Sequence, residues 1–221
     1  VFLPQDEKDR EYCKKAFEET VKSQGQNVLG WRKVPVNNTD IGKTARETEP
    51  VIEQIFIGRS NDMRDQLQFE RKLFVIRKLT ENQVRSSDIK QKSYFYVPNI
   101  SSRTFCYKGL LTPEQVEKFF VDLSDGSIES SITLVHSRYS TNTFPTWDLA
   151  QPFRFLAHNG EINTLRGNMN WMSAKEGLLH SDLFGDDLRK ILPTIIAGGS
   201  DSAMVDNVLE LLVLAGTPLE L

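Results

Sequence analysis

Residues 153–170 read FRFLAHNGEINTLRGNMN, and the character of the chain changes in the middle of this stretch. An apolar run typical of a strand stops at His158-Asn159-Gly160 and is followed by a polar tract with three further asparagines. Asn-Gly pairs mark turns, because both residues tolerate a positive φ angle. A turn does not require the polar tract that follows it, so the stretch is a candidate functional site as well as a turn.

The composition is that of an ordinary globular protein. Of the 221 residues, 39% are apolar and 26% are charged, and the net charge of −3 comes from interspersed residues of both signs. Because there is no basic block, we expect no nucleic acid partner. No apolar run approaches the length of a membrane span, and residues 1–15 lack the pattern of a signal peptide. We therefore expect no membrane partner and a cytoplasmic location, with a plastid as the alternative.

The two cysteines, Cys13 and Cys106, are too few for a disulfide framework. Together with the three histidines they form no set with metal-ligand spacing, so we expect no metal site.

Helix and strand patterns alternate without a repeat or a low-complexity linker, so one domain covering residues 1–221 is the simplest interpretation. We expect helices at 6–23 and 67–84, and strands at 28–36, 51–57, 94–100 and 103–107. The run at 73–76, Leu-Phe-Val-Ile, leaves a buried strand as the alternative for 67–84. Thr112 and Gln115 form a capping box around Pro113, which predicts the start of another helix.

Polar clusters follow two expected strands and open a final helix in the last third of the chain. The strand at 132–135 runs into HSRYST, the strand at 153–157 runs into HNGE, and the turn GGSDSA opens a helix. Each cluster has a structural interpretation: Arg138 as a surface ion-pair partner, Asn159-Gly160 as a turn, and Ser200-Asp201 as a helix cap. Together, however, they supply the groups that hold an amino acid and stabilise an oxyanion.

HSRYST at 136–141, HNGE at 158–161 and GSDS at 199–202 resemble, in this order, the motifs of the class II glutamine amidotransferases, which are N-terminal-nucleophile glutaminases. The longer strings FLPQD, SSRTFCYKG and the whole of 136–172 resemble the glutamate synthase branch of that family. The implied fold is α+β, a four-layer αββα sandwich with two mainly antiparallel sheets, which we expect to be incomplete at its N-terminus.

The resemblance implies a role for each motif. Arg138 binds the α-carboxylate of glutamine, and Asp201 receives its α-ammonium group. The side chain of Asn159 and the backbone N–H of Gly160 form the oxyanion hole. Tyr139 and Thr141 line the pocket. For His136, His158 and His180 we expect structural or surface roles, because the family's general base is not a histidine.

The family's nucleophile is a cysteine at the mature N-terminus, whose α-amino group acts as the base. The printed sequence starts with Val1, and Cys13 and Cys106 lie inside the chain. We therefore expect these residues to be part of a glutaminase domain that lacks its nucleophile and does not hydrolyse glutamine by itself.

The resemblance implies a glutaminase domain that releases ammonia from glutamine and passes it to a synthase site acting on 2-oxoglutarate. Two alternatives are a glutamine-binding module without catalysis and the glutaminase domain of another class II amidotransferase. We expect no cofactor in this segment, with FMN and an iron-sulfur cluster elsewhere in the enzyme. The expected partners are glutamine, the remaining domains of the same chain, and a reductase subunit or ferredoxin.

Overall fold

The computed structural model describes residues 1–140 and 143–218. A three-stranded antiparallel sheet has the order β1 (Phe2–Leu3), β3 (Val51–Gly58) and β2 (Asn27–Lys33). The register of β2 against β3 shifts between Val28 and Gly30, where Gly30 has a φ of 151° that suits glycine. The predicted strands at 28–36 and 51–57 are confirmed, although β2 ends earlier than expected.

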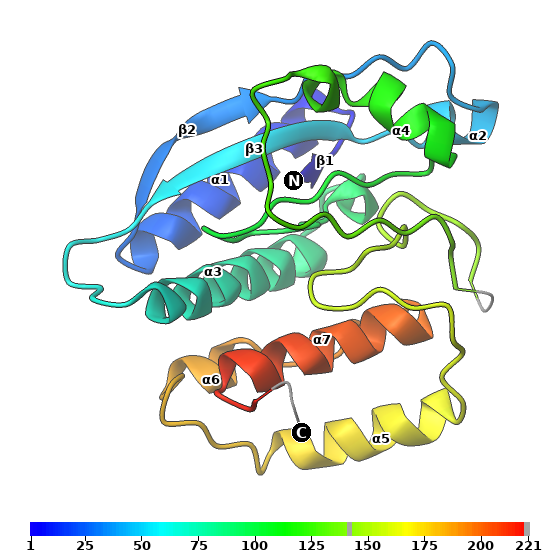
Figure 1. The fold of residues 1–221 in the computed structure, drawn as a ribbon. Helices are drawn as coiled ribbons and strands as arrows, with labels where there is room; N and C mark the ends of the chain where they lie inside the picture. Colours follow the sequence, from blue (N-terminus) through cyan, green and yellow to red (C-terminus); the bar gives the residue numbers. More distant parts are fainter. Residues whose placement is uncertain (141–142, 219–221) are drawn as a thin grey trace.

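Two long helices pack side by side against one face of this sheet (Figure 1). These are α1 (Glu7–Ser23) and α3 (Gln66–Ser86), so the sequence correctly predicts a helix rather than a strand for 67–84. Each begins at a capping aspartate: Asp6 accepts from the N–H of Asp9, and Asp65 accepts from the N–H of Leu67. Their apolar faces bury Phe17 and Ile76 in the main core, which also contains Val97 from the segment after η1.

The remaining elements are short, apart from two helices near the C-terminus. They are α2 (Lys43–Glu47), η1 (Lys92–Tyr94), α4 (Pro113–Phe119), η2 (Val121–Ser124), α5 (Leu165–Glu176), α6 (Asp187–Lys190) and α7 (Asp201–Leu214). The capping box of Thr112 and Gln115 forms as expected at the start of α4. In Figure 1, α6 and α7 form a layer beyond α3, and α5 lies beyond α7.

A buried ionic network joins α3 to α7. Arg77 pairs with Glu81 on its own helix and with Glu210 on α7, and Arg154 pairs with Glu81 and, at 3.7 Å, with Asp206 of α7. Burial alone would raise the pKa of Glu81, but the guanidinium groups of Arg77 and Arg154 outweigh it and bring the pKa to about 2. These paired charges fix the position of α7, whose first turn carries Asp201.

Four predicted strands do not form among the described residues. Residues 132–135 and 153–157 are irregular, as are 103–107, and 94–100 contributes only an isolated bridge between Phe2 and Tyr96. A strand requires a hydrogen-bonded neighbour, which an apolar run alone does not guarantee. Here Ile132, Leu134 and Val135 are 86%, 63% and 81% exposed, with no strand beside them in the described chain.

The chain therefore has mixed helix and sheet content, as the α+β class requires. The residues that the structure describes form one sheet of three strands, rather than the two packed sheets of a four-layer sandwich.

Candidate functional site

The three polar motifs, which are far apart in the sequence, meet at the N-terminal end of α7. Ser202, in the first turn of α7, has its Oγ 2.9 Å from the Oγ of Ser140 and 2.7 Å from Nε2 of His158. His136 Nε2 in turn lies 3.0 Å from the carbonyl oxygen of His158. Hydrogen bonds therefore connect HSRYST, HNGE and GSDS directly. The order of the motifs in the sequence does not reveal this proximity.

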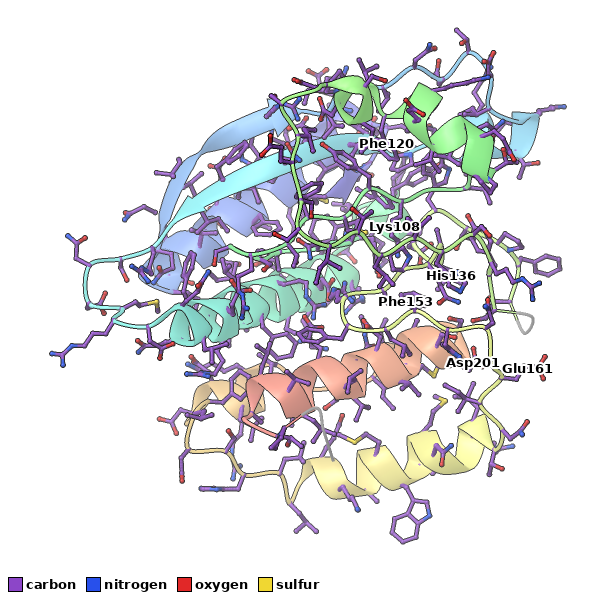
Figure 2. All side chains as sticks on the ribbon, viewed as in Figure 1. Lys108, Phe120, His136, Phe153, Glu161 and Asp201 are labelled. Atoms are coloured by element: carbon purple, nitrogen blue, oxygen red, sulfur yellow. The ribbon has the colours of Figure 1, made fainter. Side chains whose placement is uncertain are left out.

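Asp201 is the buried acid of this site, with only 1% of its surface exposed. Figure 2 shows it at the start of α7, where the segment carrying Glu161 passes toward α5. Its Oδ2 accepts from the N–H of Ile162 at 3.0 Å, and its Oδ1 accepts from the N–H of Ser202 at 2.7 Å. Burial would raise the pKa of Asp201, but these hydrogen bonds hold it below its ordinary value, so the carboxylate is charged at neutral pH.

Asp201 is not the cap of α7. The cap is Ser200, whose Oγ accepts from the N–H of Ala203 at 3.2 Å. The structural interpretation of Ser200-Asp201 therefore holds for Ser200 alone, and Asp201 is available for another role.

His136 and His158 make the same local hydrogen bond. Nδ1 of His136 accepts from the N–H of Arg138, and Nδ1 of His158 accepts from the N–H of Gly160, each at 3.1 Å. In a neutral imidazole the other nitrogen carries the proton, so Nε2–H of His136 donates to the His158 carbonyl, and Nε2–H of His158 donates to Ser202. Neither ring has a free basic nitrogen, which agrees with structural roles.

Asn159 and Gly160 are exposed at the turn that follows 153–157. Within the described residues, the side chain of Asn159 makes no hydrogen bond, so its amide is available to a ligand. The N–H of Gly160 is occupied by His158, and a ligand oxygen would have to replace the imidazole nitrogen as its acceptor.

The residues of the HSRYST motif have different surroundings. Arg138 is exposed, and its guanidinium group makes no hydrogen bond or ion pair with the described part of the chain. Tyr139 donates its hydroxyl proton to the carbonyl of Gly109 at 2.7 Å, and burial raises the pKa of this tyrosine. That bond ties the motif to the segment before α4. Thr141 lies outside the described residues.

Neither thiol of the chain lies at this site. Cys13 lies on the buried face of α1, where burial and Asp9 raise its pKa to about 12. Cys106 lines a cavity of about 350 Å³ beside β3, together with Tyr107 and Lys108 but with no residue of the three motifs, and burial raises its pKa. A raised pKa disfavours the reactive thiolate at neutral pH.

We therefore expect Cys13→Ala and Cys106→Ala to leave glutamine turnover by the complete polypeptide within about twofold of wild type, because inert thiols do not take part in the chemistry. Steady-state assays of glutamate release check this expectation. Loss of turnover in either variant at an unchanged melting temperature would make that thiol the nucleophile.

Within the described ranges, no group of three or more histidine, cysteine or acidic side chains is arranged to hold a metal ion. None of the described helices is both long and apolar enough to cross a membrane.

Comparison with known proteins agrees with this constellation of motifs. The sequence model of the protein family 'Glutamine amidotransferases class-II' matches residues 1–221, so the chain belongs to this family. It is 52% identical over 216 residues to the glutamate synthase [NADPH] large chain of Bacillus subtilis, covering 98% of this chain and 14% of that protein. The resemblance to glutamate synthases inferred from the motifs is thereby confirmed.

Other relatives come from different electron-donor classes. The chain is 46% identical to the glutamate synthase [NADH] of Saccharomyces cerevisiae, over 98% of this chain and 10% of the relative. It is 42% identical to ferredoxin-dependent glutamate synthase 1, chloroplastic/mitochondrial, of Arabidopsis thaliana, over 100% of this chain and 13% of the relative. The chain thus spans about a seventh or less of the length of these proteins.

Sequence reasoning missed three residues that connect the site. Ser140 and Ser202 stand inside the quoted motifs but have no spacing that marks them as partners. Gln151 lies seven positions before His158 and hydrogen-bonds its backbone, a contact that no sequence pattern indicates.

Proposed function

We propose that the three motifs form the glutamine site of a glutaminase domain that belongs to a glutamate synthase. The observation that carries this proposal is the hydrogen-bonded convergence of HSRYST, HNGE and GSDS around the buried carboxylate of Asp201. A charged acid, together with a guanidinium group and an amide that have no hydrogen-bonding partner among the described residues, suits a zwitterion with an amide side chain.

Arg138 and Asp201 hold the two charges of the amino acid. The guanidinium of Arg138 offers two parallel donors to the α-carboxylate. Asp201 already accepts two backbone hydrogen bonds and one from the hydroxyl of Ser202. Since a carboxylate has about four acceptor positions, the α-ammonium group takes a remaining position or replaces a hydroxyl donor. Tyr139 is proposed to line the pocket beside Arg138, and the family resemblance implies the same role for Thr141, which lies outside the described residues.

Asn159 and Gly160 stabilise the oxyanion. A cysteine thiolate attacks the side-chain amide carbon, and negative charge develops on its oxygen, to which the Asn159 amide and the Gly160 N–H donate. The α-amino group of that cysteine, which has taken the thiol proton, gives it to the side-chain nitrogen, so that the carbon–nitrogen bond breaks and ammonia leaves. Water then hydrolyses the thioester to glutamate and restores the thiol. As neither Cys13 nor Cys106 faces the site, the thiol comes from elsewhere in the complete polypeptide, and residues 1–221 alone do not hydrolyse glutamine.

We assign residues 1–221 to a single domain of a larger enzyme. Its ammonia passes to a synthase site that converts 2-oxoglutarate to glutamate, and a reductase subunit or ferredoxin supplies electrons. The expected iron-sulfur cluster binds outside this segment, because the two free thiols are too few for a cluster held by four ligands. The expected FMN is likewise assigned to another part of the enzyme. The location is cytoplasmic, or plastid as in the ferredoxin-dependent relatives.

The complete domain is proposed to be a four-layer αββα sandwich. The exposed apolar side chains of Ile132, Leu134 and Val135 support this proposal, because such a run becomes a strand when a neighbour pairs with it. Residues 132–135 and 153–157 would then belong to the second sheet.

Of the alternatives, a class II amidotransferase with another acceptor is disfavoured, since identities of 42–52% to glutamate synthases extend over nearly the whole chain. A glutamine-binding module without catalysis would need Arg138 and Asp201 but not the free amide of Asn159.

Arg138→Lys tests the proposed carboxylate contact. We expect the KM for glutamine to rise about tenfold, because lysine keeps the charge but loses the bidentate geometry. The melting temperature should not change, since the exposed guanidinium has no partner within the described residues. Steady-state kinetics measure the effect, and Arg103→Lys, another exposed arginine, is the matched control. An unchanged KM in Arg138→Lys would remove this residue from the site.

The proposed function is tested by measuring glutamate and ammonia released from glutamine by the complete polypeptide that contains these residues. With 2-oxoglutarate omitted, so that the synthase site cannot consume the ammonia, we expect equal amounts of both products. Glutamine binding without product release would favour the binding module, and the absence of both binding and release would contradict the assignment.

A further inference from the structure

The turn that carries Asn159 and Gly160 is not held by a strand in the described chain. Its approach is anchored at Phe153, which is 5% exposed and packs beneath Lys108, with Nζ 4.8 Å from the ring centroid (Figure 2). Asp206 of α7 accepts from the N–H of Phe155 at 2.7 Å. Beyond Phe155 no sheet ladder fixes the backbone, whereas oxyanion donors must be held to within about 0.5 Å.

Gln151 supplies the missing pairing. This residue is 6% exposed, and its Oε1 accepts from the N–H of His158 at 3.0 Å, while its Nε2 donates to the carbonyl of the same residue at 3.2 Å. One side-chain amide therefore satisfies both backbone groups of His158, as a residue on a neighbouring strand would.

The two hydrogen bonds from Gln151 to His158, which together we call the clamp, act on the peptide unit that leads into the site. The carbonyl of His158 and the N–H of Asn159 belong to one rigid plane, so holding the carbonyl sets the direction in which the chain enters Asn159. His136 donates to the same carbonyl at 3.0 Å, and Ser202 holds the ring of His158. Among the described residues, Gln151 is the one whose side chain hydrogen-bonds both the N–H and the carbonyl of His158.

We propose that Gln151 is the positioning residue of the oxyanion turn, orienting Asn159 and Gly160 through its paired hydrogen bonds to the backbone of His158. The inference rests on the proposed function of the site. It goes beyond that function, because Gln151 need not touch the substrate.

The chain offers a matched control in Gln26. This glutamine is 4% exposed and also clamps a loop: its Oε1 accepts from the N–H of Ser60 at 3.0 Å, and its Nε2 lies 3.1 Å from the hydroxyl oxygen of Ser60. Ser60 follows β3, and within the described residues it makes no hydrogen bond to the three motifs. Gln26 and Gln151 are thus both buried, and each makes two side-chain hydrogen bonds to a single residue. They differ in that residue, which is Ser60 for Gln26 and His158 for Gln151.

The test compares Gln151→Met with Gln26→Met in the complete polypeptide, since methionine keeps the length of the side chain but loses both hydrogen-bonding atoms. For Gln151→Met we expect kcat to fall about tenfold or more, with the glutamine KM within about twofold of wild type, because small misplacements of reacting groups cost turnover. Gln26→Met should leave both constants within about twofold. Equal losses in the two variants, or a change in KM alone, would overturn the inference.

Hydrogen exchange at the His158 amide of the unmodified protein gives a second result that does not depend on a folded variant. We expect this amide to be protected, because Gln151 accepts its hydrogen bond. Exchange at the rate of an open amide would overturn the inference even if the protein hydrolyses glutamine. Absence of glutaminase activity in the wild type would instead contradict the proposed function, so the two failures are distinguishable.

Discussion

Replacing Asn159 with alanine will lower glutamine turnover about 100- to 1,000-fold, the usual cost of removing one oxyanion donor. The side chain of Asn159 is exposed and makes no hydrogen bond within the described residues, so its loss should cost little stability. The effect should fall on kcat, because the oxyanion forms only in the transition state.

Steady-state kinetics together with a melting curve check this expectation. The control is Asn163→Ala, which removes another exposed asparagine from the same polar tract; its side chain also makes no hydrogen bond within the described ranges. A raised KM with unchanged kcat in Asn159→Ala would make this residue a ground-state binding group instead.

Asp201→Asn will weaken glutamine binding roughly 30- to 5,000-fold, the range for removing one partner of a buried charge pair. The substitution takes away the negative charge that faces the α-ammonium group. It also leaves one acceptor oxygen where Asp201 now receives two backbone N–H groups, from Ile162 and Ser202. Some loss of stability should therefore accompany the loss of affinity.

Ser200→Ala separates these two effects. It removes the cap of α7, which should cost about 1 kcal/mol of stability and leave glutamine affinity unchanged. Calorimetric titration with glutamine and thermal melting measure both quantities. If Asp201→Asn loses stability but keeps its affinity, then Asp201 is a structural residue of the turn.

Local chemistry made the helices predictable from the sequence. The apolar spacing and capping residues of α1, α3 and α4 act within a few positions of each other, and the structure places these helices where the patterns indicate. The paired strands β2 and β3 were predictable because both runs contain β-branched and aromatic residues and lie close to each other in the sequence.

The strands at 132–135 and 153–157 were not predictable in this way. An apolar run shows that a segment can pair, but pairing depends on a neighbour whose position is a property of the whole fold. Residues 132–135 lack that neighbour in the described chain, and 153–157 is held by Asp206 instead.

For the site, the motifs indicated candidate segments, and the structure shows the hydrogen bonds that connect these segments. Arg138, Asn159 and Asp201 were singled out by residue type and resemblance. The hydrogen bonds of Gln151 and Ser202 depend on tertiary placement, as does the occupation of the Gly160 N–H by His158. None of these contacts has a signature in the sequence.

The most direct test of the glutamine site is a crystal structure of the complete polypeptide trapped with an electrophilic glutamine analogue. We predict that Arg138 binds the α-carboxylate with two hydrogen bonds, that Asp201 binds the α-ammonium group, and that the Asn159 amide and the Gly160 N–H contact the side-chain oxygen. An analogue whose α-carboxylate and α-ammonium are bound by other residues, with Arg138 and Asp201 remaining in solvent or in their present contacts, would contradict the account.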